Sequence, residues 1–295
     1  MEKASVALDN ATTTRERVLD CPACGVRTIQ RFLYAKNRCE IFQCGRCGLG
    51  RTEVSAFDPA GYYTQAYFSG DRADGYADYV GSELVLHREF ARTVDFIRRY
   101  RQSGKLVEVG CAYGFFLQQA KHHFTVSGVE LADHAAAYCR RHGLAVETGT
   151  AETIARTEAA PFDVIVLLDV IEHLPDPHAI MTTFARALAP SGVIVLTTGD
   201  FGSITARAAG SRWRLMTPPQ HLWFFTRESM QRLAAGAGLE IASLDHPWKF
   251  VPLSLIAYHL GRMAGVRVKL PVSRVGLPIN LFDAMRVVLR RKAAL

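Results

Sequence analysis

Residues 106–116 read Leu-Val-Glu-Val-Gly-Cys-Ala-Tyr-Gly-Phe-Phe, and this stretch decides the fold class. A short apolar strand passes into a turn of small residues, Gly110, Ala112 and Gly114, and then into a helix. Glycine lets the main chain pass close to a ligand at the carboxyl end of a strand. A dinucleotide-binding turn reads Gly-x-Gly-x-x-Gly, whereas here the last glycine comes one residue early, which argues against NAD.

Glu130 is the second part of this pattern. It follows Val129 at the end of the next apolar run, twenty residues after Gly110. A carboxylate at that position can accept hydrogen bonds from both ribose hydroxyls of an adenosine ligand. Strand, turn, helix and acid in this order indicate a nucleoside site, and the alternative is a tight turn that binds nothing.

Apolar runs alternate with segments of helical periodicity along the rest of the chain. This alternation predicts a mostly parallel sheet with helices on both faces. We expect helices over 82–102, 114–122, 133–142, 178–189 and 226–237. We expect strands at Leu106–Val109, Thr125–Val129, Leu144–Val146, Asp163–Leu168, Val193–Thr198, Leu239–Leu244 and Met285–Leu289.

The composition of the 295 residues, 49% hydrophobic and 21% charged, is that of a soluble globular chain. A net charge of +7 suits acidic partners such as phosphates or an anionic membrane surface, but it does not establish nucleic-acid binding. The polar residues 1–20 predict a disordered tail and do not resemble a signal peptide. No run reaches the roughly 18 apolar residues of a membrane helix, so we expect a cytoplasmic protein.

Two Cys-x-x-Cys-Gly motifs, Cys21 to Gly25 and Cys44 to Gly48, lie 19 residues apart. Four thiolates at this spacing can surround one zinc ion, so residues 21–50 are predicted to form a zinc ribbon with ligands Cys21, Cys24, Cys44 and Cys47. Four protein ligands leave no open position, which favours a structural role over redox chemistry. Cys39 is isolated, and Cys111 and Cys139 are interpreted as small buried hydrophobes.

The turn and the runs that follow it resemble the class I methyltransferases, which bind S-adenosylmethionine. That resemblance implies a Rossmann-like seven-stranded sheet with strand order 3-2-1-4-5-7-6, the seventh strand antiparallel. The residues that it implies for the cofactor lie in the turn, after the second and third strands, and at the end of the fourth. They are Glu108, Gly110, Ala112, Gly114, Glu130, Leu131, Ala151, Glu152, Asp169 and Val170.

The segment from His221 to Thr226 and the aromatic linker around Tyr62 resemble a bacterial subfamily with a leading zinc ribbon. Its relatives methylate sugars, polyketides and other small metabolites. This implies domains 21–50, a connector 51–83 and a methyltransferase domain 84–295. Sugar C-methyltransferases with such a ribbon usually carry a further C-terminal domain, for which this chain lacks room.

His173 and His221 are the candidates for removing a proton from the methyl acceptor. Each follows a strand at the edge where ligands bind in such sheets, and the alternative is that each only shapes its loop. Glu172 either orients His173 or faces solvent. Tyr76 and Tyr79 either cover the methionine end of the cofactor or only pack onto the sheet.

Residues 246–282 contain no acid and read as an insertion between the last two strands. The basic residues there are Lys249, Arg262, Arg267, Lys269 and Arg274. We expect a lid for a phosphate-bearing or lipid-linked acceptor, with contact at the inner membrane surface; the alternative is a lid for a neutral molecule.

The expected function is methyl transfer to a small molecule, such as a glycan or a nucleotide- or lipid-linked sugar. One alternative is an RNA methyltransferase that uses the ribbon to bind nucleic acid. The fourth-strand motif, Asp169-Val-Ile-Glu172, argues against it, because amino-methylating nucleic-acid enzymes carry Asn/Asp-Pro-Pro-Tyr there. The other alternative is a protein that binds S-adenosylmethionine without catalysis.

Overall fold

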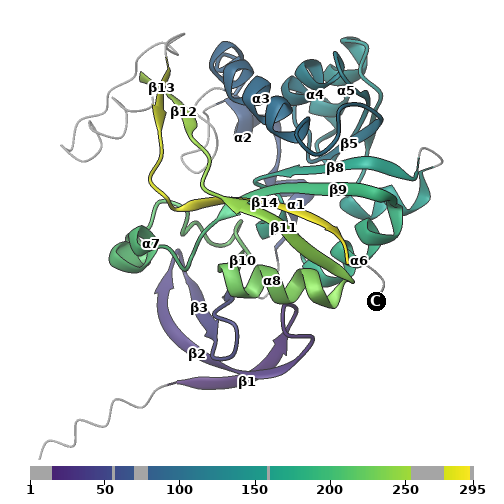
Figure 1. Ribbon diagram of the computed structural model, residues 1–295. Coiled ribbons are helices and arrows are strands. Elements are labelled where there is room, and N and C mark those ends of the chain that lie inside the picture. Colours follow the sequence, from purple (N-terminus) through teal and green to yellow (C-terminus); the bar gives the residue numbers. More distant parts are fainter. Residues whose placement is uncertain (1–14, 55–56, 70–78, 158–159, 254–275, 293–295) are drawn as a thin grey trace, which may run out of the picture.

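A seven-stranded sheet forms the centre of the computed structural model, which describes residues 15–54, 57–69, 79–157, 160–253 and 276–292 (Figure 1). Its strands are β5 (Lys105–Val109), β6 (Thr125–Glu130), β7 (Val146–Thr148), β8 (Phe162–Leu168), β9 (Leu188–Gly199), β11 (Leu239–Asp245) and β14 (Ala284–Arg291). The spatial order β7-β6-β5-β8-β9-β14-β11, with β14 antiparallel to both neighbours, confirms the predicted order and the antiparallel seventh strand.

Helices cover both faces of this sheet, as predicted. One face carries α3 (Glu83–Ile97), α4 (Phe115–Ala120) and α5 (Asp133–Arg141), and the other carries η1 (Ala151–Arg156), α6 (Pro177–Ala187) and α8 (Arg227–Gly236) (Figure 1). Strand β8 shows why the sheet is apolar on both sides. Val164 and Val166 pack into one core and Ile165 and Leu167 into the other, because side chains alternate along a strand.

Side-chain caps and strand pairing set some of the element boundaries. Asp176 begins α6 by accepting hydrogen bonds from the main-chain N–H groups of His178 and Ala179, both at 3.0 Å. The predicted helix end at 189 was wrong, since Leu188 already pairs with Phe162 of the neighbouring strand β8.

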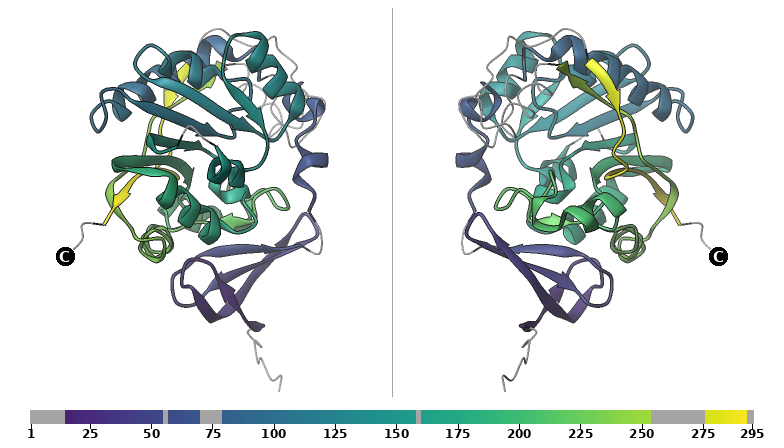
Figure 2. Two further views of the ribbon diagram at one scale, coloured as in Figure 1. Left: turned by 90° about the vertical axis from the view of Figure 1, so that its right-hand side faces the viewer. Right: turned by 90° about the vertical axis from the view of Figure 1, so that its left-hand side faces the viewer.

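A second, antiparallel sheet lies at one end of the molecule (Figure 2). It contains β1 (Glu16–Cys21), β2 (Val26–Lys36), β3 (Cys39–Cys44), β4 (Gly50–Glu53) and a two-residue strand, β10 (Trp223–Phe224). The prediction of disorder was wrong for residues 16–20, because Val18 pairs with Ile29 across β1 and β2. Residues 1–14 lie outside the described residues.

Short segments complete the structure. The connector forms α1 (Pro59–Tyr62) and α2 (Gln65–Ser69), and η2 (Ile171–His173), α7 (Ile204–Ala209) and η3 (Gly210–Arg212) lie between the main strands. The described part of the insertion is a hairpin of β12 (Lys249–Pro252) and β13 (Gly276–Ile279). Residues 254–275, with four of the basic residues noted above, and Tyr76 lie outside the described residues. No helix in the described ranges is long and apolar enough to cross a membrane.

Candidate functional site

The turn after β5 lies against its neighbours so closely that only glycine fits at two positions. Gly110 and Gly114 have φ of +70° and +72°, and Ala112 between them has φ of +46°. A Cβ on Gly110 would lie 2.7 Å from Val170 Cγ2, and one on Gly114 would lie 2.5 Å from Leu144 Cδ1. The glycines therefore allow the turn to pack directly against Val170 and Leu144 at the carboxyl edge of the sheet.

Glu130 closes this turn from the neighbouring strand β6. Its two carboxylate oxygens accept hydrogen bonds from the main-chain N–H groups of Ala112, at 2.7 Å, and Ala132, at 2.8 Å. Burial raises the pKa of Glu130, while these N–H groups act in the opposite direction. Each oxygen has a second lone pair, so the carboxylate keeps capacity to accept two ribose hydroxyls.

Glu108 is buried beneath the turn, with 4% of its surface exposed. Its Oε2 atom has no hydrogen-bond partner among the described residues, and burial raises its pKa well above the usual value. A buried polar atom without a partner is costly, so a ligand that donates a hydrogen bond fits here.

The other residues implied for the cofactor lie around the same edge. Leu131 is partly buried directly after Glu130, and Ala151 is buried at the start of η1. Val170 contacts the turn through Gly110. Glu152 is exposed on η1, so its side chain faces solvent.

Asp169 and Lys249 form an ion pair at the end of β8. Lys249 Nζ lies 2.5 Å from Asp169 Oδ2, and Thr197 Oγ1 donates to Asp169 Oδ1 at 2.8 Å. Burial opposes charge at Asp169, but Lys249 and Thr197 outweigh it and the pKa of Asp169 is lowered. In the sequence Lys249 is recognisable only as a basic residue of the insertion, because its contact with Asp169 depends on where β12 and β13 lie.

The two candidate histidines meet beside this pair. Their ring centroids lie 4.7 Å apart, with planes at 80°. His173 Nδ1 lies 2.8 Å from the carbonyl oxygen of Gln220, which can only accept, so Nδ1 carries the proton of the neutral ring. Tyr63 of the connector also reaches His173 Nδ1, at 2.9 Å. Burial lowers the pKa of both histidines, that of His221 more strongly, so both are neutral at pH 7.

Glu172 is buried, so the alternative in which its side chain faces solvent is wrong, and an orienting role toward His173 stays a prediction. It accepts a hydrogen bond from Thr198 Oγ1 at 2.9 Å and does not face solvent. Burial and the charge of Asp169 raise its pKa to about 8. Ligand atoms of Glu172, His173 and His221 lie within 4.8 Å of one another, a spacing that a cation could bridge. The existing hydrogen bonds to Glu172 and His173 instead favour a group that holds or moves a proton.

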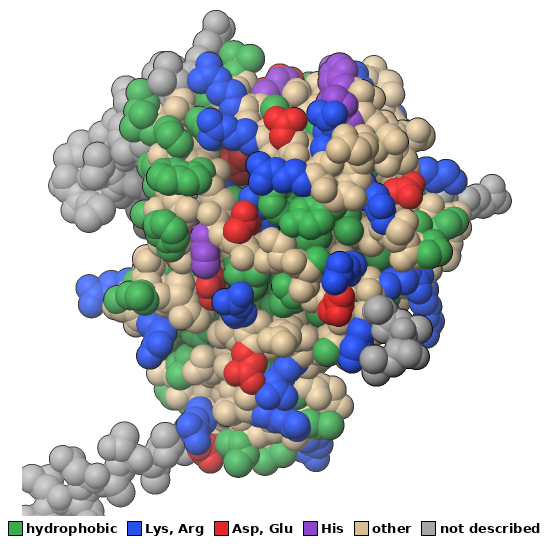
Figure 3. Space-filling model, viewed as in Figure 1, with side chains coloured by type: hydrophobic (Ala, Val, Ile, Leu, Met, Phe, Trp, Pro, Cys, Tyr) green, Lys and Arg blue, Asp and Glu red, His purple; other side chains and the backbone are tan. Residues whose placement is uncertain are grey.

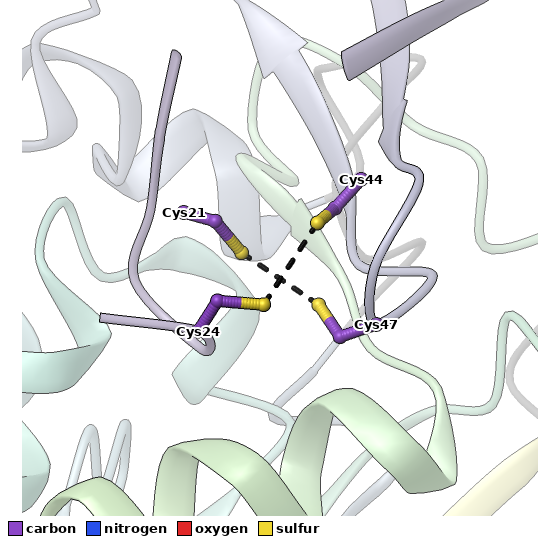
Figure 4. Close-up of side chains that lie close together, drawn as sticks. All are labelled: Cys21, Cys24, Cys44 and Cys47. Carbon is purple, nitrogen blue, oxygen red and sulfur yellow. Dashed lines mark hydrogen bonds between the residues drawn. The ribbon is translucent and has the colours of Figure 1, made fainter. Parts of the chain in front are cut away.

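The four motif cysteines converge on one point at the end of the antiparallel sheet (Figure 4). Cys21 and Cys47 have their sulfurs 3.6 Å apart, and Cys24 and Cys44 have theirs 3.9 Å apart. Zinc–sulfur bonds in a tetrahedron place sulfurs about 3.8 Å apart, so the cluster fits zinc. The hydrogen bond from Cys47 lowers the pKa of Cys21 to about 5. The other three cysteines lie apart from this cluster, and Cys111 and Cys139 are buried as predicted.

Comparison with known proteins places this geometry in a family. Residues 84–244, more than half of the chain, match a family model described as a methyltransferase domain. Ubiquinone biosynthesis O-methyltransferase of Idiomarina loihiensis is 32% identical over 156 residues, which cover 48% of this chain and 63% of that protein. The enzyme of the same name from Hydrogenovibrio crunogenus is 28% identical over 135 residues, or 43% and 56%. The chain thus spans less than two thirds of the length of these relatives.

Solved structures share the fold at low identity. Magnesium protoporphyrin IX methyltransferase of Synechocystis, with bound S-adenosylhomocysteine, superposes with a TM-score of 0.52 at 12% identity, over 79% of this chain and 98% of that one. A Pyrococcus horikoshii protein gives 0.50 at 15% identity, over 80% and 100%. These likenesses support the architecture alone.

The raised pKa of Glu172 predicts a pH dependence of stability. Glu172 binds its proton more tightly in the folded chain, so its contribution is full below about pH 4.5 and is lost as the pH rises through about 8. Relative to Glu172→Gln, the wild type should lose up to about 1.4 kcal/mol of unfolding free energy per pH unit in that window. Urea unfolding of both proteins from pH 5 to 9 measures this, with exposed Glu147→Gln as control. Parallel curves would contradict it.

Proposed function

Because the chain belongs to the class I S-adenosylmethionine-dependent methyltransferases, we propose that it methylates a hydroxyl oxygen of a small molecule. The neutral histidine pair beside the cofactor edge carries this proposal, since a hydroxyl acceptor must lose a proton. The O-methyltransferase names of the relatives support oxygen as the acceptor atom. A glycan or a nucleotide- or lipid-linked sugar remains the proposed substrate class.

The cofactor residues have separable roles in this proposal. The turn at Gly110 to Gly114 and the Oε2 atom of Glu108 receive the methionine part, and Glu130 holds the ribose. Leu131, Ala151 and Glu152 border the adenine. Asp169 and Val170 border the cofactor at the carboxyl end of β8. S-adenosylmethionine supplies an activated methyl group on a sulfonium, so the protein mainly positions the acceptor and excludes water.

His173 is proposed to accept the proton of the acceptor hydroxyl. The Gln220 carbonyl keeps its proton on Nδ1, so Nε2 points its lone pair away from that contact. His221 packs edge-on against the same ring and stays neutral, so it adds no positive charge that would oppose the transfer. As the methyl carbon passed from the sulfonium sulfur to the acceptor oxygen, S-adenosylhomocysteine would be the leaving group, and the hydroxyl proton would pass to His173 Nε2.

Zinc is proposed to fill the four-cysteine site in a structural role, because all four positions around the metal are taken. Four ribbon arginines are ion-paired: Arg15 with Glu40, Arg17 with Glu40 and Glu53, Arg31 with Glu16, and Arg51 with Glu53. This pairing gives the RNA alternative no support, because paired arginines do not offer a free cationic face to phosphates.

The insertion and α7 expose an apolar surface, which we call the margin patch: Ile204, Trp248, Leu277, Leu281 and Phe282. These side chains are 86%, 57%, 46%, 47% and 61% exposed, respectively. Thr205 Oγ1 donates to the Leu281 carbonyl, which links α7 to the insertion. Hydrophobic and basic side chains share this margin of the molecule, at the left of Figure 3. We propose that the margin patch contacts an anionic membrane surface that carries the acceptor.

Removing the carboxylate at 130 should weaken cofactor binding. Glu130→Gln is expected to weaken S-adenosylmethionine about tenfold to a hundredfold, as for hydrogen bonds to a charged group. Calorimetry on the purified, zinc-loaded protein measures the affinity. Glu147→Gln, an exposed change on β7, is the matched control. Equal affinity of the Glu130 variant and the wild type would remove the proposed site.

The histidine pair should be needed for transfer and not for cofactor binding. His173→Gln and His221→Gln are each expected to slow transfer of labelled methyl from S-adenosylmethionine to small molecules of a cell extract, by about 100-fold or more. The exposed His142→Gln serves as control, and calorimetry checks cofactor affinity. Label in the RNA fraction would favour the RNA alternative, and no label anywhere would favour a binding protein.

The margin patch should govern membrane contact. The wild type is expected to float with anionic vesicles at low salt, and Trp248→Ser with Phe282→Ser should lose most of this binding. Ile29→Ser, at a residue equally exposed but on the ribbon, is the matched control. No flotation of the wild type would rule the membrane proposal out.

A further inference from the structure

The antiparallel sheet that carries the cysteines does not end within the N-terminal segment. Strand β4 pairs with β10, which comes from the loop that carries His221, with Trp223 opposite Arg51 and Phe224 opposite Gly50. The main chain beside His221 is therefore hydrogen-bonded to the cysteine-bearing sheet.

Thr52 makes the two contacts nearest to the histidine. Its main-chain N–H donates to the Leu222 carbonyl at 2.9 Å, and its hydroxyl donates to the His221 carbonyl at 2.6 Å. Thr52 is 5% exposed, so water does not compete for these bonds. A second ribbon residue, Asn37, donates from Nδ2 to the Pro218 carbonyl at 2.8 Å.

The opposite side of the same loop is bonded to η2, where Glu172 and His173 lie. The Leu222 N–H donates to the Glu172 carbonyl at 2.9 Å, and Trp223 Nε1 donates to the Leu174 carbonyl at 2.9 Å. With the Gln220 carbonyl on His173, these bonds place the loop between the ribbon and the histidine site. A displacement of β4 would therefore also displace the main chain that contacts His173 and carries His221.

The four-cysteine cluster determines where β4 begins. Cys44 ends β3, Cys47 follows it in the tight turn, and only Gly48 and Leu49 separate Cys47 from β4. Thr226 Oγ1 donates to the Cys47 carbonyl at 2.9 Å, so the turn also contacts the start of α8. A Cβ on Gly50 would lie 2.9 Å from Phe224 Cβ, which shows how closely the strands approach.

We propose that Thr52 is a positioning residue for His221, and that the zinc ribbon supports the loop that carries this histidine. In this view zinc holds Cys44 and Cys47 with Cys21 and Cys24, the cluster holds β4, and Thr52 holds the main chain of His221 and Leu222. The ribbon then contributes to acceptor positioning and does not touch the cofactor turn. This inference rests on the proposed function for the placement of the acceptor beside His221.

Thr52→Val tests the positioning role, because it removes the hydroxyl and keeps the shape and the main-chain N–H. Amide hydrogen exchange of residues 217–226 should accelerate about fivefold, as for one lost hydrogen bond. Exchange of residues 105–114 and the affinity for S-adenosylmethionine should stay unchanged. Thr52→Ser should restore slow exchange, and Lys36→Met, which removes the ribbon contact to the Ser211 carbonyl, is the matched control.

Zinc removal from the full chain tests the remaining steps. Chelation is complete when one zinc per chain has been released. It should then accelerate amide exchange of residues 217–226 at least as much as Thr52→Val does, while calorimetry still detects cofactor binding. Unchanged exchange of residues 217–226 in either experiment overturns the proposal, and so does loss of protection that extends equally to residues 105–114. None of these measurements needs an acceptor, so a failed transfer assay and a failed coupling are distinguishable.

Discussion

The carboxylate of Glu130 bridges two main-chain turns, and the cofactor edge of the sheet depends on that bridge. It accepts from Ala112 after β5 and from Ala132 after β6, so the turn with three positive φ angles is held closed. The residue proposed to hold the ribose thus also stabilises the turn that is proposed to receive the methionine part. A site in which one group does both is arranged before the ligand arrives, which reduces the entropy lost on binding.

Around this edge, burial sets the protonation states. Burial raises the pKa of Glu108 and Glu172, that of Glu172 to about 8, and it lowers the pKa of the histidines, so Glu172 and both histidines are neutral near pH 7. Asp169 and Lys249 stay charged because each compensates the other. Such an environment suits a reaction in which a cationic donor and an acceptor hydroxyl meet with little water present, since fixed groups replace the solvent.

The elements that the sequence predicted well have signals within a few neighbouring residues. The apolar run before Gly110, the acid at 130 and the four cysteines each follow from backbone geometry or ligand spacing, and the strand order followed from a family resemblance. The two-residue β10 carries no such signal, because its conformation depends on pairing with Arg51 and Gly50, far away in sequence. Lys249 and Tyr63 lie in the site because of long-range packing, and the periodicity of hydrophobic residues does not predict such contacts.

The ribbon shows why small metal modules are hard to treat as separate domains. Its sheet is too thin to bury an apolar core alone, and Ile41 instead packs with Phe201, Trp213 and Phe224 from the larger part of the chain. The cysteines also join the core that contains α6 and α8. Zinc binding and docking therefore stabilise the same structure, and the docking bonds connect β4 to the main chain of His221 and Leu222.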